Sequence, residues 1–169
     1  MTSQSVDSYR FMSSITRRVL ETWIKQAPDR PIPWTALPKP LNRCTVALLS
    51  SGGIALKSDQ PFDQEGERRN PWWGDPSYRI IPSTATGQDI EVYHLHINPD
   101  FARRDLNCLL PIQRLAELQT AGEVGEVAPS HYSIMGYLPK PDEMLAHSVP
   151  AIIQQLKKDG VDVLLLVPS

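Results

Sequence analysis

The strand that decides the fold reads Gly160-Val161-Asp162-Val163-Leu164-Leu165-Leu166-Val167-Pro168-Ser169. Valine and leucine fill its centre, and Gly160 closes the helix expected before it. A nearly continuous apolar strand is typical of a parallel sheet that is covered on both faces. Ligands in such folds gather beyond the carboxyl ends of the strands. We therefore expect any residue that follows Ser169 in a longer product to lie in the functional site.

Length and composition indicate an ordinary globular domain. The 169 residues are 41% hydrophobic and 21% charged, which is enough apolar bulk for a layered core. The formal net charge of -2 and the scattered Lys and Arg argue against a nucleic-acid partner. The N-terminal segment lacks the pattern of a secretion signal, and no stretch approaches membrane-spanning length. These features predict a cytoplasmic protein with no membrane partner.

Two regions of the chain differ in pattern. Residues 1–42 hold an amphipathic helix over 7–26 and a proline-rich strap over 28–40. The apolar face of this helix could cover the sheet or meet a second copy of the chain, which leaves a homodimer open. Residues 43–169 are expected to form the α/β domain.

Within that domain, periodicity predicts four strands and two helices. The strands are expected at residues 44–49, 90–97, 132–138 and 161–167, with one helix starting at Pro111 and another running into Gly160. This order favours the α/β class, as a single-domain three-layer sandwich around a mostly parallel, Rossmann-like sheet. The stretch 57–88 is rich in Pro and Gly and is expected to be an ordered loop.

Several polar residues that could carry chemistry lie near strand ends. Alternation over 90–97 places His94 and His96 on one strand face, and His131 begins a later strand. Acid–base or hydrogen-bonding roles, a metal site and purely structural roles are open for these histidines, and we assign no metal. The turn Ser51-Gly52-Gly53 could be a plain turn or could contact a substrate. Cys44 and Cys108 lack the spacing of a redox pair.

Seven strings, in this order, resemble one family. They are Val46-Ala47-Leu48-Leu49-Ser50-Ser51-Gly52-Gly53-Ile54, Asp75-Pro76-Ser77-Tyr78-Arg79-Ile80-Ile81-Pro82, His94-Leu95-His96, Asp105-Leu106-Asn107, Pro111-Ile112-Gln113-Arg114-Leu115, Ala128-Pro129-Ser130-His131-Tyr132-Ser133-Ile134-Met135-Gly136-Tyr137 and Gly160-Val161-Asp162. Together they resemble the selenoprotein B family of glycine, sarcosine, betaine and D-proline reductases, from about Arg43 onward. The resemblance implies an oxidoreductase that takes a small amino-acid-like or amine substrate and a thiol electron donor.

The resemblance also implies a redox residue. In that family a selenocysteine or cysteine directly follows the strand that resembles Val161 to Val167, and it attacks the carbon next to the substrate nitrogen. This chain has no such residue, so we expect no cofactor and no reductase activity in the 169-residue product. The resemblance suggests a reading frame ended at a UGA selenocysteine codon, with the redox residue in a longer product. A natural short homologue is the alternative, and a non-catalytic small-molecule-binding or assembly module is the competing class.

The part of the family pattern that is present would supply the pocket. The expected catalytic lining is His94, His96, Asp105 and His131, and the expected substrate-binding residues are Ser51, Gly52, Gly53, Asp75 and Arg79. Arg79 could clamp a carboxylate, because a guanidinium group offers paired donors. We expect the imidazoles of the three histidines to converge near the Ser51 turn.

Overall fold

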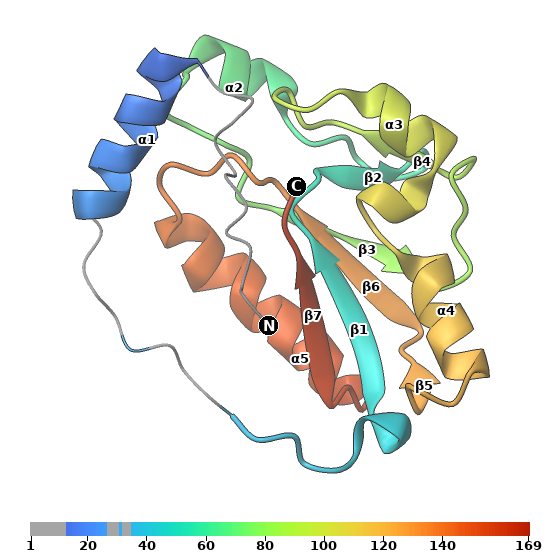
Figure 1. Cartoon of the computed structure of the whole chain (residues 1–169). Helices are drawn as coiled ribbons and strands as arrows, with labels where there is room; N and C mark the ends of the chain where they lie inside the picture. Colours follow the sequence, from blue (N-terminus) through green and yellow to red (C-terminus); the bar gives the residue numbers. More distant parts are fainter. Residues whose placement is uncertain (1–12, 27–30, 32–34) are drawn as a thin grey trace. The chain divides into compact units, whose positions relative to one another are not determined.

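The computed structural model describes residues 13–26, 31 and 35–169 (Figure 1). The chain divides into two compact units, residues 1–36 and 37–169. The first unit contains α1 (Ser14–Gln26), on which Ile15, Val19 and Ile24 are exposed apolar side chains. The predicted helical residues 7–12 and most of the predicted strap up to residue 34 lie outside the described residues.

The second unit is mixed α/β and is built on a curled sheet of mostly parallel strands. Its central strand, β1 (Thr45–Ser50), pairs in parallel with β7 (Val163–Val167) along one edge. Along the other edge β1 pairs in parallel with β5 (Glu126–Val127) near its start and with β6 (Ser130–Ile134) near its end. The last strand, β3 (Tyr78–Pro82), pairs antiparallel with β6. The sheet therefore runs β3, β6, β1, β7 across its width (Figure 1).

The main core lies against one face of β1. Val46 and Leu48 of this strand join one apolar cluster with residues of α3 (Pro99–Arg104), η2 (Leu106–Cys108) and α4 (Ile112–Thr120). The fully or nearly fully buried helical members are Ala102, Leu106, Ile112 and Leu115. Helix α4 confirms the prediction from Pro111, and the chain leaves it through Gly122 at φ +76°.

The last predicted helix is interrupted, as its proline indicates. A π-helical turn (Met144–Ser148) precedes α5 (Val149–Lys158), and Pro150 lies in the first turn of α5. Proline has no N–H to donate, so it is tolerated at the start of a helix and not in its interior. The helix predicted to run into Gly160 is confirmed as α5.

The stretch predicted as one long loop contains regular structure. It holds α2 (Gln64–Arg69) and β3, while β2 (Ile54–Leu56) comes just before it and pairs antiparallel with β4 (Ile90–Val92). A short 3-10 turn, η1 (Leu41–Arg43), precedes β1. Elements of three to six residues are too short to show a period, and their stability comes from tertiary pairing. Across the described ranges, no helix is long and apolar enough to cross a membrane.

Strand β7 leaves apolar side chains in water. Leu165 and Leu166 are 50% and 63% exposed, although the strand is wholly apolar and pairs with β1 along one edge. Unpaired backbone groups on an apolar edge strand are a template for pairing with another chain. The predicted strand is thus confirmed, whereas the expectation that it is covered on both faces is wrong for the structure described.

We predict that this edge drives self-association of the protein. A lysine at position 166 should weaken self-association by roughly tenfold or more, because each buried leucine contributes about 1.5–3 kcal/mol. Sedimentation velocity over a range of concentrations measures the effect. Leu118→Lys, at a 46% exposed position on α4, is the matched control and should leave association unchanged. A monomeric wild-type protein, or equal association of Leu166→Lys, would contradict the prediction.

Candidate functional site

The turn after β1 joins the carboxyl ends of two parallel strands. The N–H of Ser51 donates to the carbonyl of Val167 at 3.1 Å, and Ser51 Oγ accepts from the N–H of Ser169 at 2.9 Å. Gly53 has φ +60°, and a Cβ at this position would lie 2.6 Å from the sulfur of Met135. Only glycine fits this close, left-handed turn. The predicted turn is therefore positioned where strand ends meet, and its contact with a substrate stays a prediction.

His94 and His96 lie in a turn and not in the predicted strand. The β4 ladder ends with Tyr93, whose N–H donates to the carbonyl of Gly53 at 2.8 Å. The imidazole of His94 then accepts the N–H of His96 at Nδ1, at 3.1 Å, which bends the chain. A side chain that captures a nearby backbone N–H competes with strand pairing. The prediction of a strand through residue 97, with both histidines on one strand face, is wrong.

The two imidazoles nevertheless adjoin. Their ring centroids are 5.8 Å apart and the planes are nearly perpendicular at 80°. His94 is 8% exposed, and burial, followed by the nearby His96, lowers the pKa of His94. Since Nδ1 of His94 accepts a hydrogen bond, its proton lies on Nε2. His94 is thus a neutral hydrogen-bond donor beside the Gly53 turn.

Gly136 makes room for this donor. A Cβ at Gly136 would lie 2.9 Å from His94 Nε2 and 2.8 Å from the carbonyl oxygen of Ser51. The missing side chain therefore lets three segments, the Ser51 turn, the His94 turn and the end of β6, approach one another. Gly136 itself is exposed, so this contact lies at the surface.

A buried carboxylate completes the cluster. Glu67 of α2 places Oε1 2.8 Å from Nε2 of His96, and the His96 ring packs 4.7 Å from the ring of Tyr137. The side chain of Glu67 is 3% exposed, whereas that of His96 is 55% exposed. Neither periodicity nor a motif marks Glu67 in the sequence, because it lies in a short charged helix. An imidazole donor and an imidazole–carboxylate pair thus lie close together, and these are side-chain types that acid–base chemistry uses.

Asp75 and Arg79 support the helix that carries Glu67. Asp75 is buried, and its carboxylate accepts the N–H of Asp63 at 2.8 Å, while Asp63 caps α2 through the N–H of Gly66 at 2.8 Å. Arg79 donates to the carbonyls of residues 60, 61 and 78, and it stacks 4.1 Å above the ring of Phe62. The side chains of Asp75 and Arg79 are thus both hydrogen-bonded to the segment that leads into α2. Their predicted contact with a substrate stays a prediction.

Asp105 and His131 lie apart from the cluster. Asp105 is exposed and accepts the N–H of Asn107 at 3.0 Å, and its hydrogen bonds from Asn107 lower its carboxyl pKa. His131 is fully buried on β6, where its Nδ1 accepts the N–H of Leu48 at 3.1 Å. No hydrogen bond or ring contact within the described part of the chain joins His131 to His94 or His96. The structure therefore brings together two of the three histidines.

We predict that His131 makes the protein less stable in mild acid. Burial lowers the pKa of His131 from 6.5 to about 4. Between these two pKa values the imidazole takes up a proton in the unfolded chain but not in the folded chain. Stability should fall by about 3 kcal/mol as the pH drops from near 6.5 to near 4. Urea unfolding across this range measures the loss. His131→Asn keeps an acceptor near Nδ1 and should remove this part of the pH dependence; an unchanged slope in that variant would refute the assignment.

A methyl group at Gly136 tests the packing of the cluster. Gly136→Ala should displace the His94 ring and cost about 1–3 kcal/mol of stability, as overpacking does. The ring resonances of His94 in an NMR spectrum should shift, while those of His131 stay in place. Gly87→Ala is the matched control, because a Cβ there meets nothing within 4 Å. Unmoved His94 resonances in the Gly136 variant would contradict the packing described.

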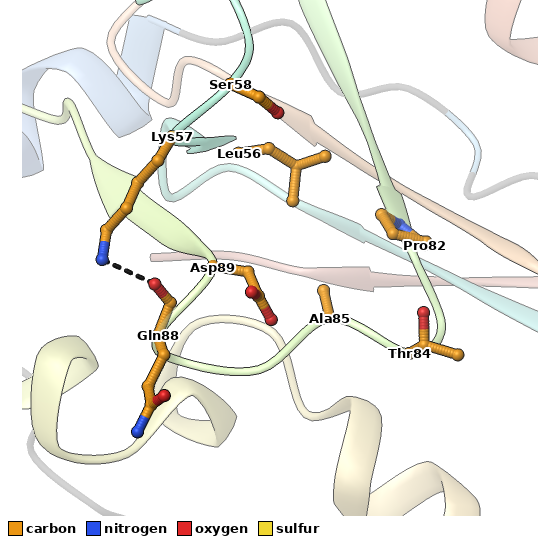
Figure 2. A pocket seen from close by; sticks show the side chains of 8 residues that line it. All are labelled: Leu56, Lys57, Ser58, Pro82, Thr84, Ala85, Gln88 and Asp89. Atoms are coloured by element: carbon orange, nitrogen blue, oxygen red, sulfur yellow. Dashed lines mark hydrogen bonds between the residues drawn. The ribbon is translucent and has the colours of Figure 1, made fainter.

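The surface has a hollow away from this cluster. A hollow of about 440 Å³ lies at the ends of β2 and β3, lined by Leu56, Lys57, Ser58, Pro82, Thr84, Ala85, Gln88 and Asp89 (Figure 2). Its Lys57 already donates to the carbonyl of Gln88 (Figure 2). Asp89 already accepts from the N–H of Thr86. Within the described residues, no three His, Cys, Asp or Glu side chains are arranged to hold a metal ion.

The structure is that of a mixed α/β protein in which His94 lies beside the turn at the carboxyl end of the parallel strand β1 and adjoins His96, which pairs with Glu67. Residues 20–169 match the family described as glycine/sarcosine/betaine reductase selenoprotein B, and the chain belongs to this family. The resemblance drawn from the seven strings is thereby confirmed.

Two curated relatives place the chain within this family. It is 33% identical over 133 residues to the D-proline reductase subunit gamma of Acetoanaerobium sticklandii, covering 79% of this chain and 52% of that protein. It is 29% identical over 144 residues to the glycine reductase complex component B subunit gamma of Carboxydothermus hydrogenoformans, covering 83% of this chain and 31% of that protein. The chain thus spans about half of one relative and a third of the other. No solved structure matches it significantly.

Proposed function

We propose that this chain forms the substrate-binding part of an amino-acid or amine reductase of the selenoprotein B type. The observation that carries the proposal is the meeting of three features: Ser51 bonds to both Val167 and Ser169, and Gly53 packs against His94. The resemblance to the family implies a selenocysteine or cysteine directly after the strand that ends in Val167. A selenolate or thiolate there would face a substrate held between the turn and the imidazoles.

The residues of the cluster suit the chemistry of reductive C–N cleavage. The nucleophile would attack the carbon next to nitrogen, the C–N bond would break, and the departing nitrogen would take a proton. Two thiols of a donor would then cleave the carbon–selenium or carbon–sulfur bond: the two thiols are oxidised to a disulfide, the carbon takes a proton, and the nucleophile is released. His94 would donate its Nε2–H to an oxygen of the substrate, and His96 would exchange the proton with its nitrogen. Partner subunits would supply further parts, in line with the subunit names of the two relatives.

The two cysteines of the chain do not fit the role of nucleophile. Cys44 is buried at the start of β1, and its Sγ lies 3.3 Å from the carbonyl oxygen of Lys39. Cys108 is exposed at the end of η2. A reactive thiolate needs a partly exposed, electropositive setting near its partner group. The proposal therefore assigns binding and proton transfer to this chain.

We predict that the chain binds small amino acids at the cluster. Titration with glycine, sarcosine, betaine and D-proline, followed through the imidazole resonances in ¹H–¹³C NMR spectra, should shift His94 and His96. Dissociation constants on the order of millimolar are expected for ligands of so few atoms. The resonances of His147, which lies on the π-helical turn, serve as the internal control and should not move.

Two variants sharpen this test. His94→Gln should weaken binding, because the rigid donor beside Gly136 is lost, whereas His147→Gln should leave it unchanged. Saturation-transfer difference spectra give an independent measure of the bound fraction. If none of the four ligands shifts His94 or His96, or if all act equally on His147, the proposed function fails.

A further inference from the structure

Glu67 is a buried charge that the proposed function does not use. Its Oε1 lies 2.8 Å from His96 Nε2, and its Oε2 is a buried atom with no hydrogen-bond partner among the residues that the structure describes. Burying a carboxylate is unfavourable unless it is paired. The single contact with His96 is therefore the interaction that gives this carboxylate a partner.

The contact decides where the His96 proton lies. A carboxylate only accepts hydrogen bonds, so Nε2 of His96 carries the hydrogen that points at Glu67. In the neutral form of the ring, Nδ1 then keeps a lone pair, as in the carboxylate–imidazole pairs of acid–base sites. The ring is 55% exposed, and its Nδ1 makes no hydrogen bond within the described part of the chain. Neutral His96 thus presents an acceptor to its surroundings.

His94 has the complementary arrangement. Its Nδ1 is occupied by the N–H of His96, so its Nε2 carries the hydrogen beside Gly136. Adjacent rings, 5.8 Å apart, therefore offer one donor and one acceptor. Such a pair suits a ligand that has a negatively charged oxygen and a nitrogen-bound hydrogen.

We propose that Glu67 is a positioning residue that holds the His96 proton on Nε2 and leaves Nδ1 as the acceptor for a substrate N–H. The inference rests on the proposed function and adds a substrate preference to it. Primary and secondary amino acids such as glycine, sarcosine and D-proline carry an N–H. The quaternary nitrogen of betaine carries none. The cluster should therefore prefer the former substrates to betaine.

The proton position can be measured without any substrate. Two-bond ¹H–¹⁵N spectra of the wild-type protein at mildly alkaline pH should show His96 as the Nε2–H tautomer, with a slowly exchanging, downfield Nε2–H proton. Glu67→Leu fills the same space without an acceptor, so this proton should exchange rapidly and disappear. Glu65→Leu, at an exposed position of the same helix, is the matched control and should leave the signal intact.

Three results would overturn the assignment. They are an Nδ1–H tautomer of His96 in the wild type, an imidazolium at this pH, and an Nε2–H signal that survives in folded Glu67→Leu. If Glu67→Leu does not fold, Glu67→Gln decides the question, because its amide oxygen can still accept from Nε2–H. An Nδ1–H tautomer in that variant and in the wild type would equally refute the proposal.

The preference among substrates gives a second readout. Wild-type protein should bind glycine, sarcosine or D-proline about fivefold to tenfold more tightly than betaine. This ratio is what one additional hydrogen bond, from the substrate N–H to His96, contributes to affinity. Glu67→Leu should lose this preference while its affinity for betaine stays the same. Equal affinities in the wild type, with the expected tautomer, refute the amine preference. Absence of binding by all four ligands refutes the proposed function and leaves the tautomer measurement to decide the role of Glu67.

Discussion

The hydrogen bond from the N–H of Leu48 to the buried imidazole of His131 satisfies the central strand where it changes partners along one edge. β5 pairs with the start of β1 and β6 with its end, so the N–H of Leu48 falls where the chain passes from one to the other. A buried N–H without an acceptor would be costly, and the side chain supplies one. Ser50 and Ser133 do the same for the N–H groups of Gly52 and Ile54. Side chains thus replace backbone acceptors where β1 ends, which lets the chain leave the sheet in a tight turn.

That turn is the fixed point around which the cluster forms, and α2 approaches it from outside the sheet. Asp75 holds the cap of α2, and Gln64 of the same helix donates to the carbonyl of Tyr93 at 2.7 Å, next to His94. Two hydrogen bonds, one to the cap of α2 and one from Gln64 to Tyr93, therefore hold the helix that brings the buried carboxylate of Glu67 to His96. A helix of six residues is not stable alone, so these tertiary bonds determine its position.

The sequence predicts the parts of this structure whose apolar pattern is long. β1 and α4 each bury an apolar run or stripe, and β7 is a continuous apolar run, so the type of each element is predicted correctly. β2, α2 and β3 are short and are held by partners distant in sequence, so no local pattern marks them. The strand predicted over 90–97 is present only as β4, because beyond it the His94 side chain competes with the backbone for the N–H of His96. The spacing of His94 and His96 marks both residues as candidates in the sequence. No local pattern marks Glu67, because its contact with His96 spans 29 positions along the chain.

The register of β7 links the sheet to the cluster. At its start, Asp162 accepts the N–H of Thr45 at 2.8 Å and pairs with Lys39 at 2.7 Å, and the hydrogen bond from Lys39 lowers the pKa of Asp162. At its end, the carbonyl of Val167 accepts from Ser51. A slip of one residue would turn every side chain of the strand to the other face and break both anchors. The carboxyl end of β7 is thereby held at the turn that contacts His94, so the register of the sheet sets the direction in which the chain leaves this strand.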